Sequence, residues 1–424
     1  MQAHPDPDKA VGIREQMDEI SLMIEKLNAR QKSGNKVIVF AASMFLTTSI
    51  AYTLFQFSDV NTILSATTPS PFRLFPYSFA RRLICQLSHY DMLPIDFASE
   101  DAYMIRETHF PSTRSRNLRF CVPIGLAAGI DVNCDGPAGL LKLGFGSIEV
   151  GTVTLAPSAA VDEANVSLVD NSIISSIDRS DGSKGLAEVS DNLCTYIEHD
   201  RPDDMLTRNT VCGVSVKINS PDDVETIFKN DRLIENADYI ALDVSHLTSI
   251  DSVSKIIAKV DTVSAPSLPG IYLKMGLAQS FPPNPQIVRE INNSSNIAGV
   301  SIRGSGIARV GEKDMNVSGA VSKGKSTEAV SAWYKALSKD KEIIASGGVA
   351  SGKDALAKIE AGAAHVQIFS AFAFEGAQIA RRIKTQLSVQ LMNKGYYNLE
   401  EAIGSNHREP TQRLKQAMKR RKRF

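Results

Sequence analysis

Beyond about residue 120, the chain alternates between short runs of β-branched and aliphatic residues and longer segments that mix polar and apolar positions. The short runs have the length of buried strands, and the mixed segments have the length of amphipathic helices. Regular alternation of this kind is typical of parallel sheets covered by helices. The pattern therefore predicts an α/β fold with eight parallel strands, at residues 120–127, 147–154, 212–218, 239–245, 270–276, 297–303, 342–346 and 365–370.

The last two predicted strands end in small residues. The run Glu342–Ala345 leads into Ser346–Gly352 (SGGVASG), and the run His365–Ser370 ends in serine before a further helical pattern. Such ends leave backbone N–H groups accessible, as in the phosphate site that TIM barrels build after strands seven and eight. We therefore expect a closed (β/α)8 TIM barrel that binds a phosphate-bearing ligand. An open doubly wound sheet is the alternative.

An uncharged segment, Val37–Phe57, precedes the predicted barrel. As a helix it would be roughly 30 Å long, which is the thickness of the hydrocarbon core of a bilayer. Four basic residues lie on its N-terminal flank within about a dozen positions, whereas Asp59 follows it on the other side. This asymmetry favours a transmembrane helix, with its N-terminal side in the matrix or the cytosol, over a buried core helix. A cleaved signal peptide fits poorly, because a long segment rich in acidic residues comes first.

Residues 13–27 carry a short heptad pattern. Ile13, Met17, Ile20, Ile24 and Leu27 repeat with the alternating spacing of a coiled-coil seam. Two heptads alone are marginal as a helix. A protein partner that supplies a second helix and a solvated amphipathic helix without a partner both remain open.

The remaining segments complete the predicted organisation. A link containing Pro69, Pro71 and Pro76 precedes helical patterns at 78–89 and around 97–107. The C-terminal residues 415–424 are strongly basic, which fits either a solvated tail or contact with anionic lipid or RNA. The predicted domains are an N-terminal amphipathic helix (1–36), a transmembrane helix (37–57), a linker with membrane-proximal helices (58–112), the barrel (113–400) and a basic tail (401–424).

Composition excludes several classes of function. The chain has 47 basic and 47 acidic residues and no net charge, so no nucleic-acid partner is expected. Its five cysteines include no C-x-x-C pair, so the sequence indicates neither a metal site nor a disulfide framework.

Four blocks of sequence carry a family resemblance. They are Pro123–Gly129 (PIGLAAG), Leu143–Thr154 (LGFGSIEVGTVT), the run SGGVASGKDALAKIEAGAAHVQIFSAFAFEG from Ser346, and Ala402–Arg408 (AIGSNHR). Through these blocks, residues 80–408 resemble the class 2, membrane-anchored dihydroorotate dehydrogenases, the quinone-linked flavoenzymes of pyrimidine synthesis. The resemblance implies FMN as cofactor, ubiquinone as electron acceptor and a single-pass location in the mitochondrial inner membrane.

The resemblance also assigns positions around the cofactor. Backbone donors in the two loops that end strands seven and eight would hold the phosphate. Lys274 would lie near the pyrimidine ring of the flavin and stabilise negative charge there, and Ser215 replaces a flavin-binding asparagine. Taken singly, each glycine is also explained by a tight turn. The full set is Ala127, Ala128, Gly129, Thr152, Ser215, Lys274, Ser318, Gly319, Gly347, Gly348, Phe369 and Ser370.

The substrate side departs from the family pattern. The family loop N-V-S-S-P-N-T is replaced by Asp243–Ser249 (DVSHLTS), which puts His246 at the position of the serine base and Thr248 at that of an asparagine. Imidazole is a competent general base near neutral pH. Elsewhere the family's F-D-K lysine is replaced by Val132, the asparagine of its I-N-R motif by Ser175, and its T-N-T triplet by Arg303, Gly304 and Ser305.

These changes remove polar partners that the family provides for orotate. Each lost hydrogen bond to a charged or strongly polar ligand costs about 1.5–3 kcal/mol, so several losses would weaken binding by orders of magnitude. Arg179 or Arg303 could supply positive charge from another wall, because arginine pairs well with carboxylates. Surface exposure at loop ends is the other explanation for these two arginines.

We therefore expect a dihydroorotate dehydrogenase-like membrane flavoprotein that is catalytically impaired. As an enzyme it would oxidise dihydroorotate, with hydride passing to the flavin, a proton to His246 and electrons to ubiquinone. The alternatives are a non-catalytic accessory subunit of a membrane assembly and a flavin oxidoreductase with another substrate.

Overall fold

The computed structural model describes residues 70–96, 104–108, 117–161, 166–169, 172–175, 180–201, 210–263, 268–310 and 312–409. All of them belong to one of two structural units, Thr62–Phe424. The predicted heptad segment 13–27, the span 37–57 and the last residues of the basic tail lie outside the described residues. Within those that are described, no helix combines the length and apolar character needed to cross a membrane. The membrane anchor, the coiled coil and the domain limits therefore stay predictions.

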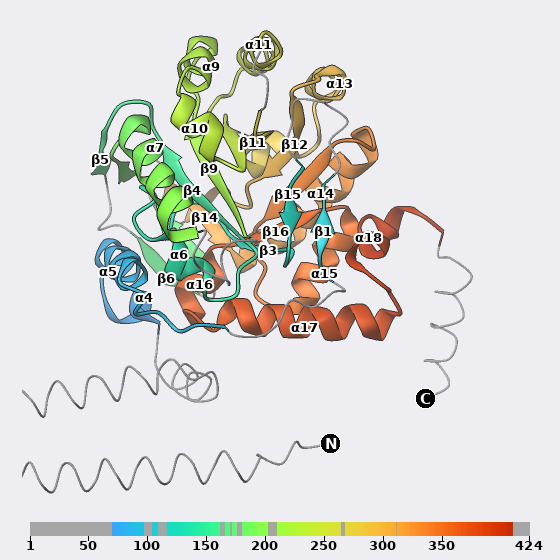
Figure 1. The fold of residues 1–424 in the computed structure, drawn as a ribbon. Helices are drawn as coiled ribbons and strands as arrows, with labels where there is room; N and C mark the ends of the chain where they lie inside the picture. The colour runs from blue at the N-terminus through green and yellow to red at the C-terminus, as the bar shows by residue number, and fades with distance from the viewer. Residues whose placement is uncertain are drawn as a thin grey trace, which may run out of the picture. The chain divides into compact units, whose positions relative to one another are not determined.

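Eight parallel strands close into a barrel (Figure 1). The circle closes where the last strand pairs with the first, through Val366 and Ile124. Closure confirms the predicted TIM barrel and excludes the open sheet. The strands are β3 (Ile124–Leu126), β4 (Ser147–Val153), β9 (Val211–Lys217), β10 (Tyr239–Asp243), β11 (Gly270–Met275), β12 (Ile297–Ile302), β15 (Glu342–Ser346) and β16 (His365–Ile368).

The first predicted strand, 120–127, is wrong at its start. Phe120 belongs to β2 (Arg119–Phe120), which pairs antiparallel with β1 (Arg106–Glu107), and the barrel strand begins four residues later at Ile124. The same pairing corrects the helix predicted around 97–107 at its described end. A continuous apolar run does not show where a strand breaks. Here Phe120 is held instead by stacking on His365, with ring centroids 4.3 Å apart.

Alternation along the strands separates the barrel interior from the layer beneath the helices. In β10, Tyr239 and Ala241 belong to a cluster inside the barrel, whereas Ile240 and Leu242 join the larger cluster between strands and helices. Because side chains alternate with period two, Asp243 shares the inward face of Tyr239 and Ala241. Inward positions at the C-terminal ends of the strands therefore reach the mouth of the barrel.

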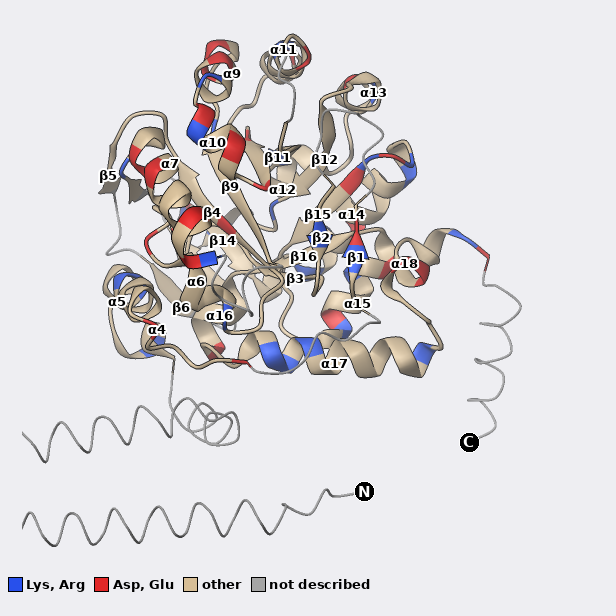
Figure 2. Cartoon of the chain, viewed as in Figure 1, with Lys and Arg blue, Asp and Glu red and all other residues tan. Residues whose placement is uncertain are grey.

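Amphipathic helices cover the outside of the barrel, and they carry most of the charged side chains while the strands carry few (Figure 2). Polar caps define several of their starts. Asn284 accepts hydrogen bonds from the N–H groups of Gln286 and Ile287, and Ser351 accepts one from Asp354. The helices among the described residues beyond 130 are α6 (Pro137–Leu141), α7 (Leu186–Thr195), α9 (Pro221–Phe228), α10 (Asp231–Asn236), α11 (Ile250–Asp261), α12 (Leu277–Ser280), α13 (Pro285–Asn293), α14 (Lys323–Ala336), α15 (Gly352–Ala361), α16 (Ser370–Glu375), α17 (Ile379–Lys394) and α18 (Leu399–Ala402), with a π-helical turn at Tyr196–Asp200 and 3-10 turns at Ala320–Ser322 and Ser405–His407.

Two small antiparallel sheets are inserted after β4 and β12. Because these insertions follow the C-terminal ends of barrel strands, they stand beside the mouth of the barrel. In the larger sheet Asn316 pairs with Ser175, and Gly319 pairs with Ser172. One sheet contains β5 (Ser158–Val161) and β8 (Ser180–Ser183), and the other has the order β13 (Gly306–Val310), β14 (Lys313–Gly319), β7 (Ser172–Ser175) and β6 (Ser167–Val169).

Two helices precede the barrel in the described part of the chain, α4 (Pro71–Leu74) and α5 (Tyr77–His89). The second confirms the helix predicted at 78–89, whereas Pro71 begins a short helix where the sequence predicted a link. Helix α5 approaches α6 so closely that a Cβ atom on Gly139 would lie 2.4 Å from the carbonyl oxygen of Ser88. The small helical segment is thus packed firmly against the barrel.

A buried ion pair ties the segment after α5 to the outer layer. The Lys384 ammonium on α17 lies 2.5 Å from an Asp96 carboxylate oxygen, and both side chains are buried. Removal of one partner from a buried pair leaves an uncompensated charge and typically costs about 3–5 kcal/mol.

We expect Asp96→Asn to lower the free energy of unfolding by about this amount in denaturant titrations. Asp91→Asn is the control, because Asp91 pairs with Lys142 from an exposed position where an ion pair contributes about 1 kcal/mol or less. Equal effects of the two substitutions would contradict a buried, unscreened pair at Asp96.

Candidate functional site

A cavity of about 1100 Å³ opens at the C-terminal ends of the barrel strands. This is the end at which TIM barrels place their binding sites. Its wall combines loops that follow the barrel strands with residues of the inserted sheet of β7 and β14. It contains most of the residues that the sequence predicts for cofactor and substrate, namely Ala127, Ala128, Gly129, Thr152, Ser175, His246, Thr248, Lys274, Gly304, Ser305, Ser318, Gly319, Gly347, Gly348, Phe369 and Ser370.

Two predicted residues do not line this cavity. Val132 is 2% exposed and Ser215 is fully buried. The Ser215 hydroxyl accepts a hydrogen bond of 3.0 Å from the Lys274 ammonium, so it acts on the cavity through the lysine. Val132 brings no polar group to the site.

The loop after β15 forms a glycine-lined wall. Gly347 and Gly348 have φ angles of +105° and +68°, which side chains rarely tolerate. A Cβ atom on Gly304 would lie 2.1 Å from the Gly347 Cα, so the loop also needs glycine in its neighbour. Among the described residues, the N–H groups of Gly347, Gly348 and Phe369 donate no hydrogen bond. Three backbone donors thus belong to two loops that line one cavity.

Lys274 brings a positive charge from the barrel interior to the floor of the cavity. Its ammonium lies 2.6 Å from a carboxylate oxygen of Glu149, and both side chains are buried. Glu149 also accepts hydrogen bonds of 3.0 Å from Tyr239 and from Gln367. The cation is therefore fixed by a polar network that is itself satisfied.

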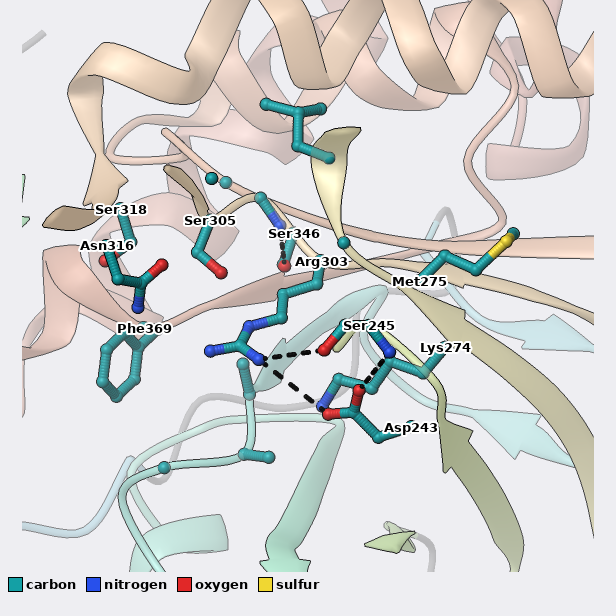
Figure 3. Close-up of a pocket in the computed structure, with 18 of the residues that line it drawn as sticks. Asp243, Ser245, Lys274, Met275, Arg303, Ser305, Asn316, Ser318, Ser346 and Phe369 are labelled. Atoms are coloured by element: carbon teal, nitrogen blue, oxygen red, sulfur yellow. Dashed lines mark hydrogen bonds and ion pairs between the residues drawn. The ribbon is translucent and has the colours of Figure 1, made fainter. Parts of the chain in front are cut away.

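Asp243 ends β10 and lies among positive charges. Its carboxylate accepts a hydrogen bond of 3.0 Å from the N–H of Ser245, and the Arg303 guanidinium lies 4.0 Å away (Figure 3). Burial alone would raise the pKa of Asp243, but the charges of Lys274 and Arg303 and the Ser245 hydrogen bonds together lower it below its ordinary value. Asp243 is therefore an acceptor at neutral pH.

His246 stands exposed at the rim. Its Nε2 lies 3.1 Å from the side-chain oxygen of Asn219. Partial burial lowers the pKa of His246, Lys217 and Arg303 lower it further, and Asp243 opposes them. A lowered pKa keeps the imidazole neutral near pH 7, which is the form that can take up a proton.

Several residues in the cavity wall were missed by the sequence reasoning. Lys217 ends β9, Asn316 lies on β14, and Lys323 begins α14, where it pairs with Asp354. The position of Lys217 at a strand end is a signal that could have identified it. Nothing in the local pattern around Asn316 indicates that its strand folds over the barrel mouth.

A second cavity of about 400 Å³ lies at the helical segment. It is lined by Phe72, Phe75 and Tyr77 together with Phe374 of α16, which also lines the larger cavity. Arg73 lies over the Phe374 ring, 5.6 Å from its centroid. A smaller cavity lined by several aromatic side chains and Arg73 thus adjoins the larger one through the shared side chain of Phe374.

The electrostatic setting of His246 can be tested by substitution. We expect Lys217→Gln to raise the pKa of His246 toward its ordinary value, because a neighbouring positive charge is removed. The measurement is an NMR titration of histidine-labelled protein, with the His246 signal assigned through His246→Gln. Lys229→Gln is the control, since Lys229 pairs with Glu225 at the surface of α9. An unchanged His246 pKa in Lys217→Gln would contradict this account.

Comparison with known proteins identifies the family to which the chain belongs. The sequence model for dihydroorotate dehydrogenase matches residues 112–391. A mitochondrial dihydroorotate dehydrogenase (quinone) from mouse is 27% identical over 367 residues, which cover 80% of this chain and 89% of that protein. A dihydroorotate dehydrogenase (quinone) from Xanthobacter autotrophicus is 28% identical and covers 69% of this chain and 87% of its own length. The crystal structure of the Eimeria tenella enzyme with ferulenol superimposes with a TM-score of 0.67 at 27% identity, covering 78% of this chain and 96% of that one. The chain therefore belongs to the dihydroorotate dehydrogenase family.

Proposed function

We propose that this protein is a membrane-anchored, FMN-binding oxidoreductase of the dihydroorotate dehydrogenase type whose substrate wall is altered. One observation carries the proposal: a single cavity at the barrel mouth joins the Gly347–Gly348 loop, the Lys274 ammonium and the His246 imidazole. These are a set of backbone donors, a fixed cation and a neutral base, which are the parts that a flavin and a proton-losing substrate require.

The residues of the cavity fit FMN. The N–H groups of Gly347, Gly348 and Phe369 would hold its phosphate, because they are donors without partners among the described residues. Lys274 would face the pyrimidine portion of the ring system and stabilise negative charge there. FMN, when bound, would supply the capacity to accept a hydride and to pass electrons on.

The substrate half of the site supports weakened binding of orotate-type ligands. Val132 contributes no cation to the cavity, and Gly304 contributes no side chain. Ser175 and Thr248 contribute hydroxyl groups where the resemblance leads us to expect amides, whereas Ser305 keeps a hydroxyl at the position of a threonine. Fewer hydrogen bonds to a polar ligand mean lower affinity. We therefore propose activity toward dihydroorotate that is impaired rather than lost.

The smaller cavity supports a quinone as electron acceptor. Its aromatic lining suits an apolar ring, and Phe374 adjoins the larger cavity. The relatives from mouse and Xanthobacter are named as quinone enzymes, and the mouse protein is named as mitochondrial. We extend both properties to this chain as part of the proposal, with the inner membrane as the location and Val37–Phe57 as the anchor.

A different substrate is the second candidate function. The observation that favours it is Arg303, which extends into the cavity beside Asp243 and Ser245 (Figure 3). A non-catalytic accessory role is the remaining alternative, and it has no structural feature of its own in its favour.

Flavin binding separates these functions. We expect the purified full-length protein in detergent to bind FMN and to bind riboflavin far more weakly, because only FMN carries the phosphate for the Gly347–Gly348 loop. Flavin absorbance during equilibrium dialysis measures both ligands. Anaerobic dihydroorotate should then bleach the bound flavin slowly. Absence of FMN binding would contradict both enzyme hypotheses, namely dihydroorotate oxidation and oxidation of another substrate. Flavin that is bound but not bleached would indicate either a flavin carrier or an enzyme with another substrate.

His246 provides the test of the proposed base. We expect His246→Ala to slow anaerobic flavin reduction by a factor of about 100, the effect of removing a positioned general base. Stopped-flow absorbance measures the rate. The control is His199→Ala, because His199 lies exposed in the π-helical turn away from the cavity wall. If both variants reduce the flavin as fast as the parent protein, His246 does not take the substrate proton.

A further inference from the structure

We propose that Arg303 is the specificity-determining residue that binds the carboxylate of the substrate, from the loop after β12 instead of the loop after β3. The inference rests on the proposed function, because it concerns the substrate of the same cavity. It assigns recognition of the anion to the residue at the first position of the triplet that replaces the family's T-N-T, and not to the position of the family's lysine, where Val132 stands.

The backbone and side chain of Arg303 are both positioned for this role. Its N–H donates a hydrogen bond of 2.9 Å to the Met275 carbonyl at the end of β11, which fixes the start of the side chain. Its guanidinium donates a hydrogen bond of 3.3 Å to the Ser245 hydroxyl and extends toward Asp243 (Figure 3). The side chain is 41% exposed within the cavity wall. It is therefore oriented and still accessible to a ligand.

The Arg303 guanidinium also has N–H donors that bind none of the described residues. Its contact with Asp243 is long, at 4.0 Å, and involves one of its nitrogens, as does the bond to Ser245. No other partner of the Arg303 side chain occurs among the described residues. Arginine carries five N–H donors in a planar fork that matches a carboxylate. A ligand carboxylate can therefore pair with the free edge while Asp243 and Ser245 hold the other.

Other cations in the described cavity wall are less suited. Lys274 is paired with Glu149, and Lys323 is paired with Asp354. Lys217 has no ion pair among the described residues, but a lysine offers a point charge rather than a fork. Arg303 is the cation that combines accessibility, orientation and the geometry of a carboxylate partner.

The position of Arg303 relative to His246, the proposed base, also supports Arg303 as the partner of the substrate carboxylate. Arg303, Lys217 and Asp243 are close enough to His246 to act on its titration. His246 and Arg303 also line the same cavity, so a carboxylate bound to Arg303 shares that cavity with the imidazole. Val132, which stands where the resemblance predicts a lysine for this anion, is buried outside the cavity wall. The positive partner for the substrate has thus moved from one wall to another.

The test compares ligands that differ only in the anion. Orotate and its carboxamide are titrated by calorimetry into the full-length protein with saturating FMN. We expect Arg303→Gln to weaken orotate binding about 10- to 100-fold, which corresponds to the loss of a charged hydrogen bond, and to leave carboxamide binding little changed. Arg303→Lys should lie between the parent and Arg303→Gln, because it keeps the charge and loses the fork. Arg309→Gln is the matched control, since Arg309 pairs with Asp314 on the exposed face of β13 and β14.

Two outcomes would overturn the proposal. One is orotate binding in Arg303→Gln that equals that of the parent, and the other is a parent protein that does not distinguish orotate from the carboxamide. In the first of these outcomes, weaker orotate binding in Lys217→Gln would assign the anion to Lys217. Failure of the proposed function is read separately, from the absence of FMN uptake, and the calorimetric comparison of orotate with its carboxamide is carried out in either case.

Discussion

The pairing of Lys274 with Glu149 inside the barrel is the interaction on which the site depends. The two residues belong to β11 and β4, which are separated by β10 and β9 around the circle, so their contact of 2.6 Å crosses the interior. A buried ammonium needs such a partner, because desolvation of an isolated charge costs several kcal/mol. The hydrogen bonds from Tyr239 and Gln367 to Glu149 satisfy the carboxylate in turn. The network fixes a positive charge at the base of the cavity before any ligand arrives, which is the condition for electrostatic stabilisation without reorganisation.

The glycine loop after β15, Gly347–Gly348, is held in place by different contacts. The Gly347 carbonyl accepts a hydrogen bond of 3.1 Å from Ser326, and the Lys358 ammonium lies 2.5 Å from the same hydroxyl. Burial lowers the pKa of Lys358 to about 7, with Asp354 opposing the shift and Lys323 adding to it. The support beneath the loop is therefore only partly charged at neutral pH. The loop presents its own N–H groups as the main donors, and their direction is set by backbone conformation rather than by a mobile side chain.

The sequence was sufficient for the barrel because each strand is a short apolar run between helical patterns, and the loop residues Gly347 and Gly348 belong to a long distinctive block. It was not sufficient where long-range pairing decides the structure. Phe120 pairs with Arg106 in an antiparallel strand pair and does not belong to the first barrel strand. Its ring stacks on His365, and the local sequence pattern does not indicate this long-range contact. Asn316 reaches the cavity through pairing of β14 with β7, two segments about 140 residues apart. The motifs identified candidate residues, but the side-chain partners of Arg303 depend on how the loop after β12 packs against the loop after β10.

The altered wall changes what kind of ligand the cavity can accept. An asparagine both donates and accepts hydrogen bonds, whereas an ionised Asp243 only accepts and Arg303 only donates. Asp243 is satisfied by the Ser245 N–H and by nearby positive charge, so it needs no donor from a ligand and repels a ligand oxygen that carries negative charge. The contact between Arg303 and Asp243 is long, and the Arg303 side chain is 41% exposed although Asp243 is buried, so a ligand anion can engage the guanidinium without displacing a close ion pair. Under the proposed function, Asp243 in place of an asparagine and Arg303 in place of a threonine would sharpen discrimination by charge and orientation, and the site as a whole would make fewer hydrogen bonds to the ligand. Under the proposed function, such a site would select its substrate mainly through one anion contact at Arg303.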